Sequence, residues 1–333
     1  MTVPPTNNPA RIAALGFHFP GSPLRIDSLP LSPEETGRLP RLGQVITHIA
    51  DEDSTALMVH AARDVLARHG GSASDIRMVI SAPSLVTSYG LEIPAVAVRA
   101  ELGLTNAQCL NLAQGCVGVL RGIDLAAQLV NAQPEGGDIM VVTSCRASSH
   151  TRNMNHGAFF WGDGAAAVIV SAKGKTGLEI AGYAEASNDA NWGAMRIGLG
   201  DAMEATSADD INRISVHFAT PEDQIDYIRA EQRHFATVTN TLLDRQGLHE
   251  DDIDAVFLPS TGKNRIPILF SEHRGLLKKV GTDFSYAHFG GVDPILSISQ
   301  HLEQGAGRPG GWLLLVSPAF TAQWGGLLLR KPD

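Results

Sequence analysis

The sequence predicts an α/β fold made of two similar halves. Short apolar runs of strand length alternate with helical patterns along almost all of the 333 residues. Strands that alternate with helices of this length form parallel βαβ units, so helices should cover both faces of the sheet. Two Trp-Gly turns, at Trp161-Gly162 and Trp324-Gly325, each lead into a strand that closes its half. This repeated pattern indicates a duplicated α/β unit.

The N-terminal half is predicted to cover residues 1–174. Ser54–His69 has apolar or small side chains at helical spacing and follows acidic residues that suit a helix start. Val117–Asn131 is a strongly apolar helix. The predicted elements of this half are, in order, strand Arg11–Phe17, helix Ser54–His69, strand Met78–Ser81, helix Ile93–Leu102, strand Gln108–Leu112, helix Val117–Asn131, strand Asp138–Ser144 and strand Ala165–Ser171.

The C-terminal half is predicted to cover residues 175–333. The composition becomes polar and glycine-rich at Ala172–Gly177, which is typical of a boundary between halves. Beyond it, the alternation of helices and strands resumes. The predicted elements of this half are, in order, helix Ala219–Gln246, strand Ala255–Pro259, helix Arg265–Leu276, helix Pro294–Gln304, strand Trp312–Val316 and strand Gly325–Arg330.

The composition argues against several classes of protein. Hydrophobic residues make up 44% of the chain and charged residues 18%, which allows a large buried core and argues against disorder. The net charge of −9 argues against non-specific nucleic-acid binding, which needs a clustered basic surface. The segment Met1–Leu15 has no signal-peptide pattern, and the longest apolar runs are of strand length. We therefore expect a cytoplasmic protein without a membrane span.

One of the three cysteines is a candidate nucleophile. Three cysteines are too few for a disulfide framework and suit a reducing compartment. Cys116 lies between a predicted strand and a strongly apolar helix, where unpaired N–H groups and the helix dipole favour a thiolate. A buried structural thiol fits the same position. Cys109 lies within a predicted strand and Cys145 ends one, so both are predicted to be packing residues.

Several segments resemble the β-ketoacyl-acyl-carrier-protein synthase III family. Asn111–Ala126 resembles the helix that carries the family's nucleophile, with Cys116 in its place. Phe160–Ala166 resembles the family's FGDGAGA turn, Ser54–Ser81 its early helix-strand unit, and Pro318–Leu329 its closing glycine-rich turn and strand. The resemblance implies a thiolase fold with duplicated βαβ halves in a five-layered αβαβα core. It also implies that Cys116 carries the acyl group and that the protein is a homodimer.

Two positions depart from the family pattern. Ser260 stands where the family has the His of an HQAN motif, and His288 stands where it has the Asn of a GNTSAAS motif. In the family, this His and Asn donate hydrogen bonds that stabilise the enolate formed when carbon dioxide leaves a malonyl thioester. The loss of one such donor typically costs on the order of 10²–10³ in rate. We therefore expect decarboxylative condensation to be impaired in this chain.

Cys116, His288 and Asp293 instead match the pattern of a nucleophile, a base and an orienting carboxylate. His288 could deprotonate Cys116 and then an incoming acceptor, while Asp293 fixes the imidazole tautomer. Both residues have another interpretation. His288 could be a core histidine satisfied by backbone groups, and Asp293 could cap the helix Pro294–Gln304.

Further site residues follow from the resemblance. It implies an oxyanion hole formed by the backbone N–H groups of Cys116 and Phe320. It matches Arg265 to a family arginine that is implicated in carrier-protein docking. An exposed helix arginine without such a role is an equal alternative for Arg265. It places Glu92 near the position at which the family has an aromatic residue that enters the partner subunit's acyl tunnel. Ser260, Arg265 and Glu92 are accordingly predicted to bind substrate.

No metal site and no cofactor are predicted. His150 and His156 lack metal-ligand spacing and have no Cys or carboxylate partner nearby in the sequence. Ser32–Asp51 lacks the Trp and Gly-Ile-Arg residues with which the family holds coenzyme A. This difference favours a carrier-protein donor or a loosely held thioester.

Together these features favour an acyltransferase of natural-product biosynthesis. An acyl group such as malonyl would pass from a coenzyme A or acyl-carrier-protein thioester to Cys116. It would then pass to a hydroxyl of a sugar or polyketide acceptor, giving an ester without decarboxylation. The H-x-x-x-x-D pattern of His288 and Asp293 resembles a subgroup that includes the cervimycin-type malonyl transferases. The alternatives are a starter-unit condensing enzyme of the synthase III type and a catalytically silent partner that binds acyl carriers.

Overall fold

The computed structural model describes residues 9–85, 87, 91–147, 159–191, 195–196, 217–218, 220–319 and 322–333. Its centre is a sheet of nine strands, in the order β11-β12-β13-β8-β1-β7-β6-β4-β5 within these ranges. The sheet has two parts, which join where β1 (Arg11–His18) pairs with β8 (Leu178–Ser187). Only Arg11–Glu179 and Ile12–Leu178 pair across this join. Each part is therefore a half-sheet in its own right.

The N-terminal half-sheet has five strands. From the join they are β1, β7 (Gly164–Ser171), β6 (Asp138–Cys145), β4 (Ile76–Ser81) and β5 (Gln108–Asn111). β7 is antiparallel to β1 and β6, whereas β6, β4 and β5 are parallel to one another. Every residue of β6 and β7 is buried, as expected for strands covered on both faces.

The C-terminal half-sheet repeats this order and these directions. β8, β13 (Gln323–Arg330), β12 (Trp312–Ala319) and β11 (Ile253–Phe257) take the places of β1, β7, β6 and β4. The place of β5 is reduced to a single parallel bridge between Val256 and Val280. The predicted boundary at residues 174 and 175 lies in the turn between β7 and β8. Its role as a domain boundary stays a prediction.

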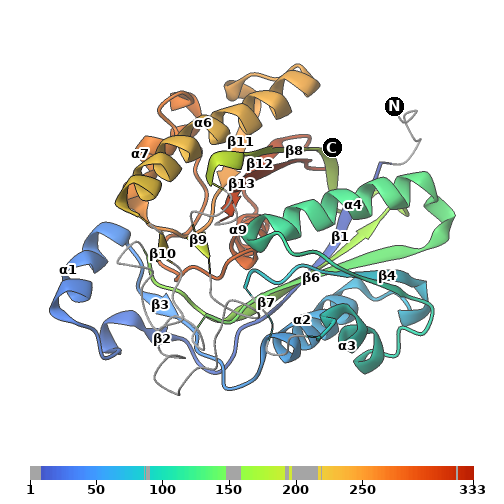
Figure 1. The fold of residues 1–333 in the computed structure, drawn as a ribbon. Helices are drawn as coiled ribbons and strands as arrows, with labels where there is room; N and C mark the ends of the chain where they lie inside the picture. Colours follow the sequence, from blue (N-terminus) through green and yellow to red (C-terminus); the bar gives the residue numbers. More distant parts are fainter. Residues whose placement is uncertain are drawn as a thin grey trace.

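Helices form three layers around the two half-sheets (Figure 1). α4 (Gly118–Ala132) and α9 (Val292–Glu303) lie in the middle and contact strands of both half-sheets. α2 (Ser54–His69) and α3 (Pro94–Glu101) cover the N-terminal half-sheet from outside, and α6 (Pro221–Gln246) covers the C-terminal one. The chain therefore has the five-layered αβαβα arrangement expected from the sequence.

The remaining described helices and strands are one helix of ten residues and six elements of two to four residues. They are α1 (Pro33–Leu42), β2 (Leu24–Arg25), β3 (Ile46–Thr47), β9 (Met195–Arg196), β10 (His217–Phe218), α7 (Ile266–Leu269) and α8 (Arg274–Leu277). Among the described residues, no helix combines the length and apolar character needed to cross a bilayer.

The structure differs from the sequence expectations at several elements, including β8, α7 and α9. β8 is not predicted, because Gly182 and two glutamates interrupt its apolar pattern. The predicted helix Arg265–Leu276 is divided into α7 and α8, because His273 has an extended φ of −125°. The predicted helix Pro294–Gln304 begins earlier, at Val292, so Asp293 lies inside its first turn.

Candidate active site

Cys116 lies where the chain turns from β5 into α4. Gly115 has a φ of +56°, a left-handed conformation that favours glycine, and Gly115–Val117 form a single turn of 3-10 helix. α4 follows directly from this turn, so Cys116 lies at the positive end of the α4 dipole. The residue is 3% exposed. The structure thus places Cys116 at the N-terminal end of α4, as the sequence predicted.

His288 brings the C-terminal half to the same point. Its Nε2 lies 3.8 Å from the Sγ of Cys116, within hydrogen-bond range for sulfur, although 172 residues separate the two. Phe159 meets the imidazole edge-on at a centroid distance of 4.9 Å, and Trp161 lies against it at 4.7 Å. The backbone N–H of His288 donates to the carbonyl of Phe160 at 2.7 Å. Aromatic packing and a backbone bond thus fix the position of the imidazole.

Asp293 accepts three hydrogen bonds. Its Oδ2 lies 2.6 Å from His288 Nδ1 and accepts from the N–H of Ser260 at 2.7 Å. Its Oδ1 accepts from the N–H of Phe289 at 2.8 Å. Because a carboxylate can only accept, the neutral imidazole carries its proton on Nδ1 and presents Nε2 to Cys116. The N-cap residue of α9 is Gly291 and Asp293 lies within the helix, so the geometry matches an orienting carboxylate rather than an N-cap residue.

Asp293 also controls the protonation of His288. Burial lowers the pKa of His288, but the charge and hydrogen bond of Asp293, together with Cys116, outweigh burial and raise it to about 9. The imidazole is therefore mostly protonated near neutral pH. In this state it can hydrogen-bond a thiolate at Cys116.

Comparisons with known proteins show what the chain is similar to. Residues 110–188, which include Cys116, match the family model of 3-oxoacyl-[acyl-carrier-protein] synthase III. A β-ketoacyl-[acyl-carrier-protein] synthase III of Nitratidesulfovibrio vulgaris is 26% identical, over 84% of this chain and 83% of its own. The mycobacterial synthase III of Mycobacterium marinum is 24% identical, over 85% and 83%.

Solved structures share the fold over nearly the full length. The priming β-ketosynthase of the R1128 polyketide pathway has a TM-score of 0.82 and 19% identity, over 100% of this chain and 99% of its own. The synthase III of Pseudomonas aeruginosa has a TM-score of 0.79 and 20% identity, over 98% and 99%. The chain therefore resembles β-ketoacyl-acyl-carrier-protein synthase III in part of its sequence and in its fold. Its five layers form the thiolase fold that the sequence motifs implied.

Ser260 donates two hydrogen bonds at the site, and neither goes to Cys116 or His288. Its hydroxyl donates to the carbonyl of Tyr286 at 2.6 Å, and its backbone N–H donates to Asp293. The sequence predicted that Ser260 binds substrate. In the structure Ser260 helps to hold the carboxylate that orients His288, and its hydroxyl proton is directed at a backbone carbonyl, while its contact with substrate stays a prediction.

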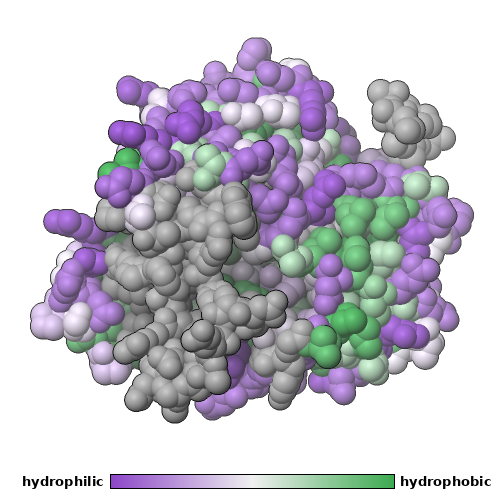
Figure 2. Space-filling view, viewed as in Figure 1, coloured by the Kyte–Doolittle hydropathy of each residue, from purple (hydrophilic) through white to green (hydrophobic). Residues whose placement is uncertain are grey.

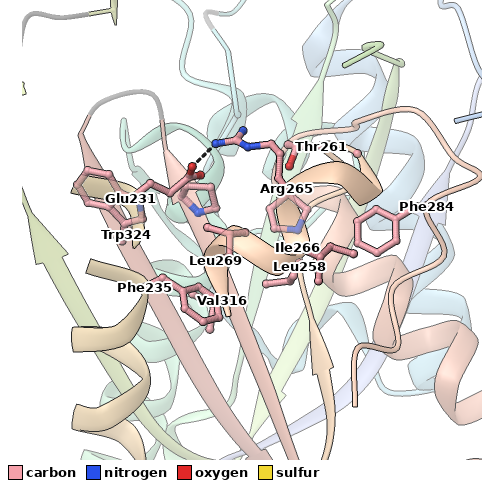
Figure 3. Close-up of a pocket in the computed structure, with 13 residues that line it drawn as sticks. Glu231, Phe235, Leu258, Thr261, Arg265, Ile266, Leu269, Phe284, Val316 and Trp324 are labelled. Carbon is pink, nitrogen blue, oxygen red and sulfur yellow. Dashed lines mark hydrogen bonds and ion pairs between the residues drawn. The ribbon is translucent and has the colours of Figure 1, made fainter. Parts of the chain in front are cut away.

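Arg265 forms an ion pair with Glu231 of α6, over a small pocket (Figure 3). Burial raises the pKa of Glu231, and the charge of Arg265 opposes this shift. The pocket beneath has a cavity volume of about 10 Å³, room for roughly one water molecule, and Phe235, Leu258 and Trp324 are among its lining residues. The guanidinium is thus engaged within the protein, and its predicted contact with a carrier protein stays a prediction.

The structure does not bring every predicted site residue to Cys116. Glu92 lies just before α3 and is partly buried, with one carboxylate oxygen that has no hydrogen-bond partner among the described residues. No hydrogen bond within these residues links Glu92 to Cys116 or His288. Phe320, the predicted second oxyanion donor, lies outside the described residues, as do His150 and His156.

Gln44 is a site residue that the sequence did not indicate. It is 2% exposed and connects the two halves behind His288. Its Nε2 donates to the carbonyl of Ser260 at 2.6 Å, and its Oε1 accepts from the N–H of Phe160 at 2.7 Å. Gln44 therefore links the backbone that holds Asp293 to the backbone that holds His288. It belongs to no recognisable motif, so only the folded chain reveals this role.

Two further polar side chains support the site. Ser84 accepts a hydrogen bond at Oγ from the N–H of Gly291, at the start of α9. Asp163 of the Trp-Gly-Asp turn accepts from the N–H groups of Ala50 and Ala147, both at 2.8 Å. The family-like turn thus has a structural task, which is to tie the segment around residue 50 to the end of β6.

The other two cysteines are placed as the sequence predicted. Cys145 is fully buried at the end of β6, and burial raises the pKa of its thiol well above its usual value. Cys109 lies in β5, where its thiol donates to the carbonyl of Ala95, and burial again raises its pKa. Both environments disfavour the thiolate, which is the nucleophilic form.

Proposed function

We propose that this protein is an acyltransferase that forms esters in natural-product biosynthesis. It takes an acyl group such as malonyl from a coenzyme A or acyl-carrier-protein thioester onto Cys116. It then passes this group, without decarboxylation, to a hydroxyl of a sugar or polyketide acceptor. The proposal rests on one observation, the buried line of contacts from Cys116 Sγ to His288 Nε2 and from His288 Nδ1 to Asp293.

In the first step the Cys116 thiolate attacks the thioester carbonyl. A bond forms between Sγ and the carbonyl carbon, and the bond to the donor sulfur breaks. His288 supplies its Nε2 proton to the departing thiolate. The N–H of Cys116, at the start of α4, is the proposed donor to the carbonyl oxygen, with the N–H of Phe320 as the second donor.

Acylation changes the charge of His288 in the direction that the second step needs. Cys116 contributes to the raised pKa of His288 through its hydrogen bond and its charge. An acylated sulfur carries no charge and has no proton to share, so these contributions disappear and the pKa falls. The imidazole can then accept the proton of the acceptor hydroxyl, and the oxygen attacks the acyl group while Cys116 leaves as a thiolate.

The same geometry is a poor match for carbon–carbon bond formation. Stabilising an enolate calls for donors that face the thioester oxygen, and each is worth on the order of 10²–10³ in rate. Ser260, at the position of the family's histidine, directs its hydroxyl to the carbonyl of Tyr286. His288 is then the one side-chain donor left at the two family positions. This supports transfer to oxygen over condensation.

A second function has support of its own. The relatives are named β-ketoacyl synthase III, and a solved neighbour is a priming β-ketosynthase of a polyketide pathway. By analogy, this chain could condense a starter unit with His288 as the sole polarising group. The silent carrier-binding partner has less support, because a site without chemistry has no need of a Cys-His-Asp arrangement. The likeness to cervimycin-type malonyl transferases stays a prediction from the sequence pattern.

The proposed donor needs no resident cofactor, and a carrier protein needs a basic surface to dock on. Arg265 is engaged with Glu231, whereas Lys263 lies on the same loop with its stem against Gly43. Lys263 is therefore the better candidate for contact with an acidic carrier. Free thiols at all three cysteines fit the proposed cytoplasmic location.

We also infer a homodimer, which pairs across the N-terminal half-sheet. β5 is the last strand of the described sheet, and an apolar area extends over the part of the surface around α3, α4 and β4 (Figure 2). Leu91 is 99% exposed, Ile93 50% and Val96 44%. An unpaired edge strand beside exposed apolar side chains is typical of a contact between subunits.

The proposed function can be tested by a chase of the acyl-enzyme. The protein is loaded with radiolabelled malonyl-coenzyme A, freed of donor by gel filtration, and then offered a glycoside or a malonyl-carrier protein. Transfer to oxygen predicts an alkali-labile labelled ester of the glycoside. His288→Ala should still form acyl-enzyme, but its transfer to the glycoside should fall by about 10²–10⁴.

Two results of the chase would contradict ester formation. Release of carbon dioxide, with label on the carrier protein as a β-ketoacyl thioester and none on the glycoside, would establish the condensing enzyme instead. If neither the wild type nor His288→Ala retains label at Cys116, the silent partner is the better description. Cys116→Ala is the matched control, since it removes the proposed carrier of the label and leaves His288 and Asp293 in place.

A further inference from the structure

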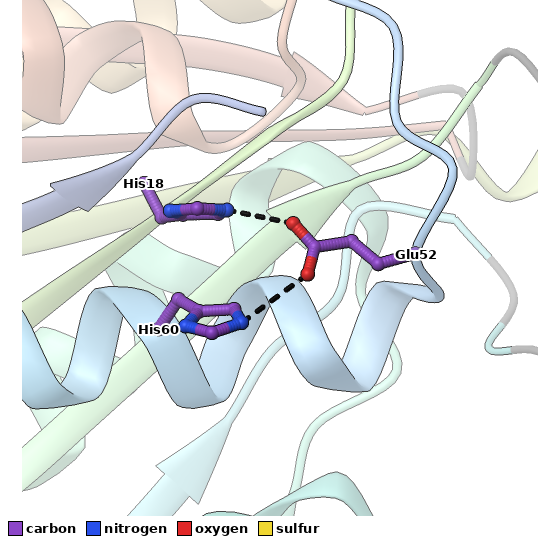
Figure 4. Close-up of side chains that lie close together, drawn as sticks. All are labelled: His18, Glu52 and His60. Carbon is purple, nitrogen blue, oxygen red and sulfur yellow. Dashed lines mark hydrogen bonds and ion pairs between the residues drawn. The ribbon is translucent and has the colours of Figure 1, made fainter. Parts of the chain in front are cut away.

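A second cluster of titratable side chains lies apart from the Cys-His-Asp site, at the end of β1 (Figure 4). His18 is the last residue of β1, Glu52 lies in the turn before α2, and His60 lies in α2. Glu52 Oε1 is 2.7 Å from His18 Nε2, and Glu52 Oε2 is 3.2 Å from His60 Nε2. One ligand atom from each residue can be chosen so that all three lie within 4.8 Å of one another.

The backbone beneath these side chains is held by close packing between β1 and α2. Gly16 faces α2 so closely that a Cβ at this position would lie 2.3 Å from the backbone nitrogen of Val65. The N–H of Phe17 donates to the side chain of Asp64 in α2 at 2.9 Å. The two imidazoles consequently lie side by side, with ring centroids 4.6 Å apart and planes tilted by 31°. Strand and helix thus present both nitrogens to one carboxylate.

The charges around the cluster favour a cation. Within the described part of the chain, the two histidines are the side-chain partners of Glu52, and no Lys or Arg bonds to it. The two arginines of α2 are each paired with another carboxylate, Arg63 with Glu101 at 3.0 Å and Arg68 with Asp64 at 2.8 Å. The side chains of His18, Glu52 and His60 are 28%, 29% and 42% exposed, so an ion can enter from solvent.

We propose that His18, Glu52 and His60 bind a divalent transition-metal ion of the zinc class. Two imidazole nitrogens and one carboxylate oxygen form a donor set that zinc accepts, with a fourth position for water. Ligand atoms about 2.0–2.1 Å from a tetrahedral ion lie about 3.3 Å from one another. His18 Nε2 lies 2.7 Å from Glu52 Oε1 and His60 Nε2 lies 3.2 Å from Oε2, and one ligand atom from each residue can be chosen within 4.8 Å of the others, so rotation of these half-exposed side chains can form the site.

The site is separate from the proposed acyl transfer and has a structural consequence. An ion here would fasten the end of β1 to α2 and to the turn that contains Glu52. The N–H of Ala50, in the same turn, donates to Asp163 of the Trp-Gly-Asp turn beside His288. The ion would thus stabilise one wall of the active site, because a ligand that binds the folded state alone raises its stability.

Metal titration of the untagged, chelator-stripped full chain tests the proposal. Zn²⁺ binding by calorimetry and the visible spectrum of bound Co²⁺ are measured on the wild type, Glu52→Gln, His60→Ala and His69→Ala. The wild type should bind one equivalent with a spectrum of tetrahedral nitrogen and oxygen coordination, and Zn²⁺ should raise its Tm by a few degrees. Glu52→Gln and His60→Ala should bind more than about 10-fold more weakly and lose the Tm shift.

His69→Ala is the matched control, because His69 pairs with Asp138 alone and should leave binding unchanged. Since Cys116 and His288 could also hold an ion, Cys116→Ala is titrated in parallel and should retain the site. The proposal is overturned if the wild type binds no Zn²⁺, if Cys116→Ala abolishes binding, or if Glu52→Gln and His60→Ala bind as tightly as the wild type. All variants are checked for native fold by their Tm without metal.

Discussion

Asp293 is the residue on which the geometry of the site depends. Its two oxygens accept from one imidazole and two backbone N–H groups, and the backbone donors come from segments on either side of His288. A buried carboxylate costs free energy unless such donors surround it. Asp293 has these donors beside His288, where it fixes the tautomer and raises the pKa of the imidazole.

The titration of His288 gives a first prediction. The His288 pKa is raised to about 9, so its imidazolium is present below this pH and is lost as the pH rises through it. Carbamidomethylation of Cys116 removes the contribution of the thiol and should shift the titration to lower pH. NMR of histidine ring protons, assigned with His288→Ala, measures both titrations. An unchanged midpoint after alkylation would show that Cys116 and His288 are not coupled.

Asp293→Asn extends this measurement. It removes the charge that opposes burial, so the His288 pKa should fall further than it does on alkylation. A titration that stays near 9 in this variant would contradict the role given to Asp293.

Gln44 gives a second prediction. Gln44→Ala removes the bonds to Ser260 and Phe160, so the supports of Asp293 and His288 can shift relative to each other. We expect acyl-transfer turnover to fall about 10- to 100-fold, since small displacements of reacting groups have effects of this size. The His288 titration should broaden or shift as well.

The control is Gln133→Ala, because Gln133 bonds to Arg77 at the surface. It should leave turnover and titration unchanged. If Gln44→Ala lowers the Tm but alters neither quantity, Gln44 is structural and does not position the site.

At the residue scale, the sequence predicts which side chains meet at the site better than it predicts the contacts that hold them. Cys116 follows from its place before an apolar helix, and His288 and Asp293 from a family-like turn. Gln44 could not be predicted, because its partners Ser260 and Phe160 are distant in the chain and contribute backbone atoms. Side-chain identity says nothing about such contacts. For the same reason the sequence predicts that Ser260 binds substrate but cannot show that its hydroxyl donates to the backbone carbonyl of Tyr286.

At the scale of elements, the turn between His288 and α9 is closely constrained. Gly290 has a φ of +62°, and a Cβ there would lie 2.4 Å from Ser84 Oγ. Gly290→Ala should cost about 2–5 kcal/mol, the sum of left-handed strain and overpacking. Gly103→Ala is the control, since Gly103 has a φ of +64° but open space around it, and should cost about 1–2 kcal/mol. Urea unfolding measures both, and equal losses would refute the contact with Ser84.

Most helices and buried strands could be predicted because their apolar patterns are regular. α2 has the predicted bounds, α4 is shifted by one residue at each end, and β7 starts one residue earlier than predicted. β8 was missed because its neighbours, β1 and β13, stabilise a strand whose own sequence is mixed. The predicted helix Arg265–Leu276 breaks because His273 bonds to Glu250, a tertiary contact that local periodicity cannot indicate.

At the scale of the whole molecule, duplication explains why the site lies where it does. α4 and α9 occupy equivalent places in the two halves and lie together in the middle layer. Cys116 precedes α4 and His288 precedes α9, so the repeat brings their side chains to one point. In the sequence, the two Trp-Gly turns are the one sign of this repeated strand order. The matching strands have the same direction and position in the two half-sheets but do not share a sequence pattern.

The proposed dimer gives a prediction at this scale. Light scattering after gel filtration should give twice the mass of one chain. Ile93→Lys with Val96→Lys should yield monomers, because two charges would be buried in the contact. Ile268→Lys is the control, since Ile268 is also 50% exposed but lies in α7 of the other half. A monomeric wild type, or dimers that persist in the double variant, would contradict this interface.

Transfer without decarboxylation is tested most directly by the intact mass of the protein after incubation with malonyl-coenzyme A and no acceptor. The predicted result is one added malonyl group that keeps its carboxylate, located at Cys116 by peptide mapping and absent in Cys116→Ala. An adduct lighter by the mass of carbon dioxide, which is an acetyl group, would contradict this prediction and indicate a condensing enzyme.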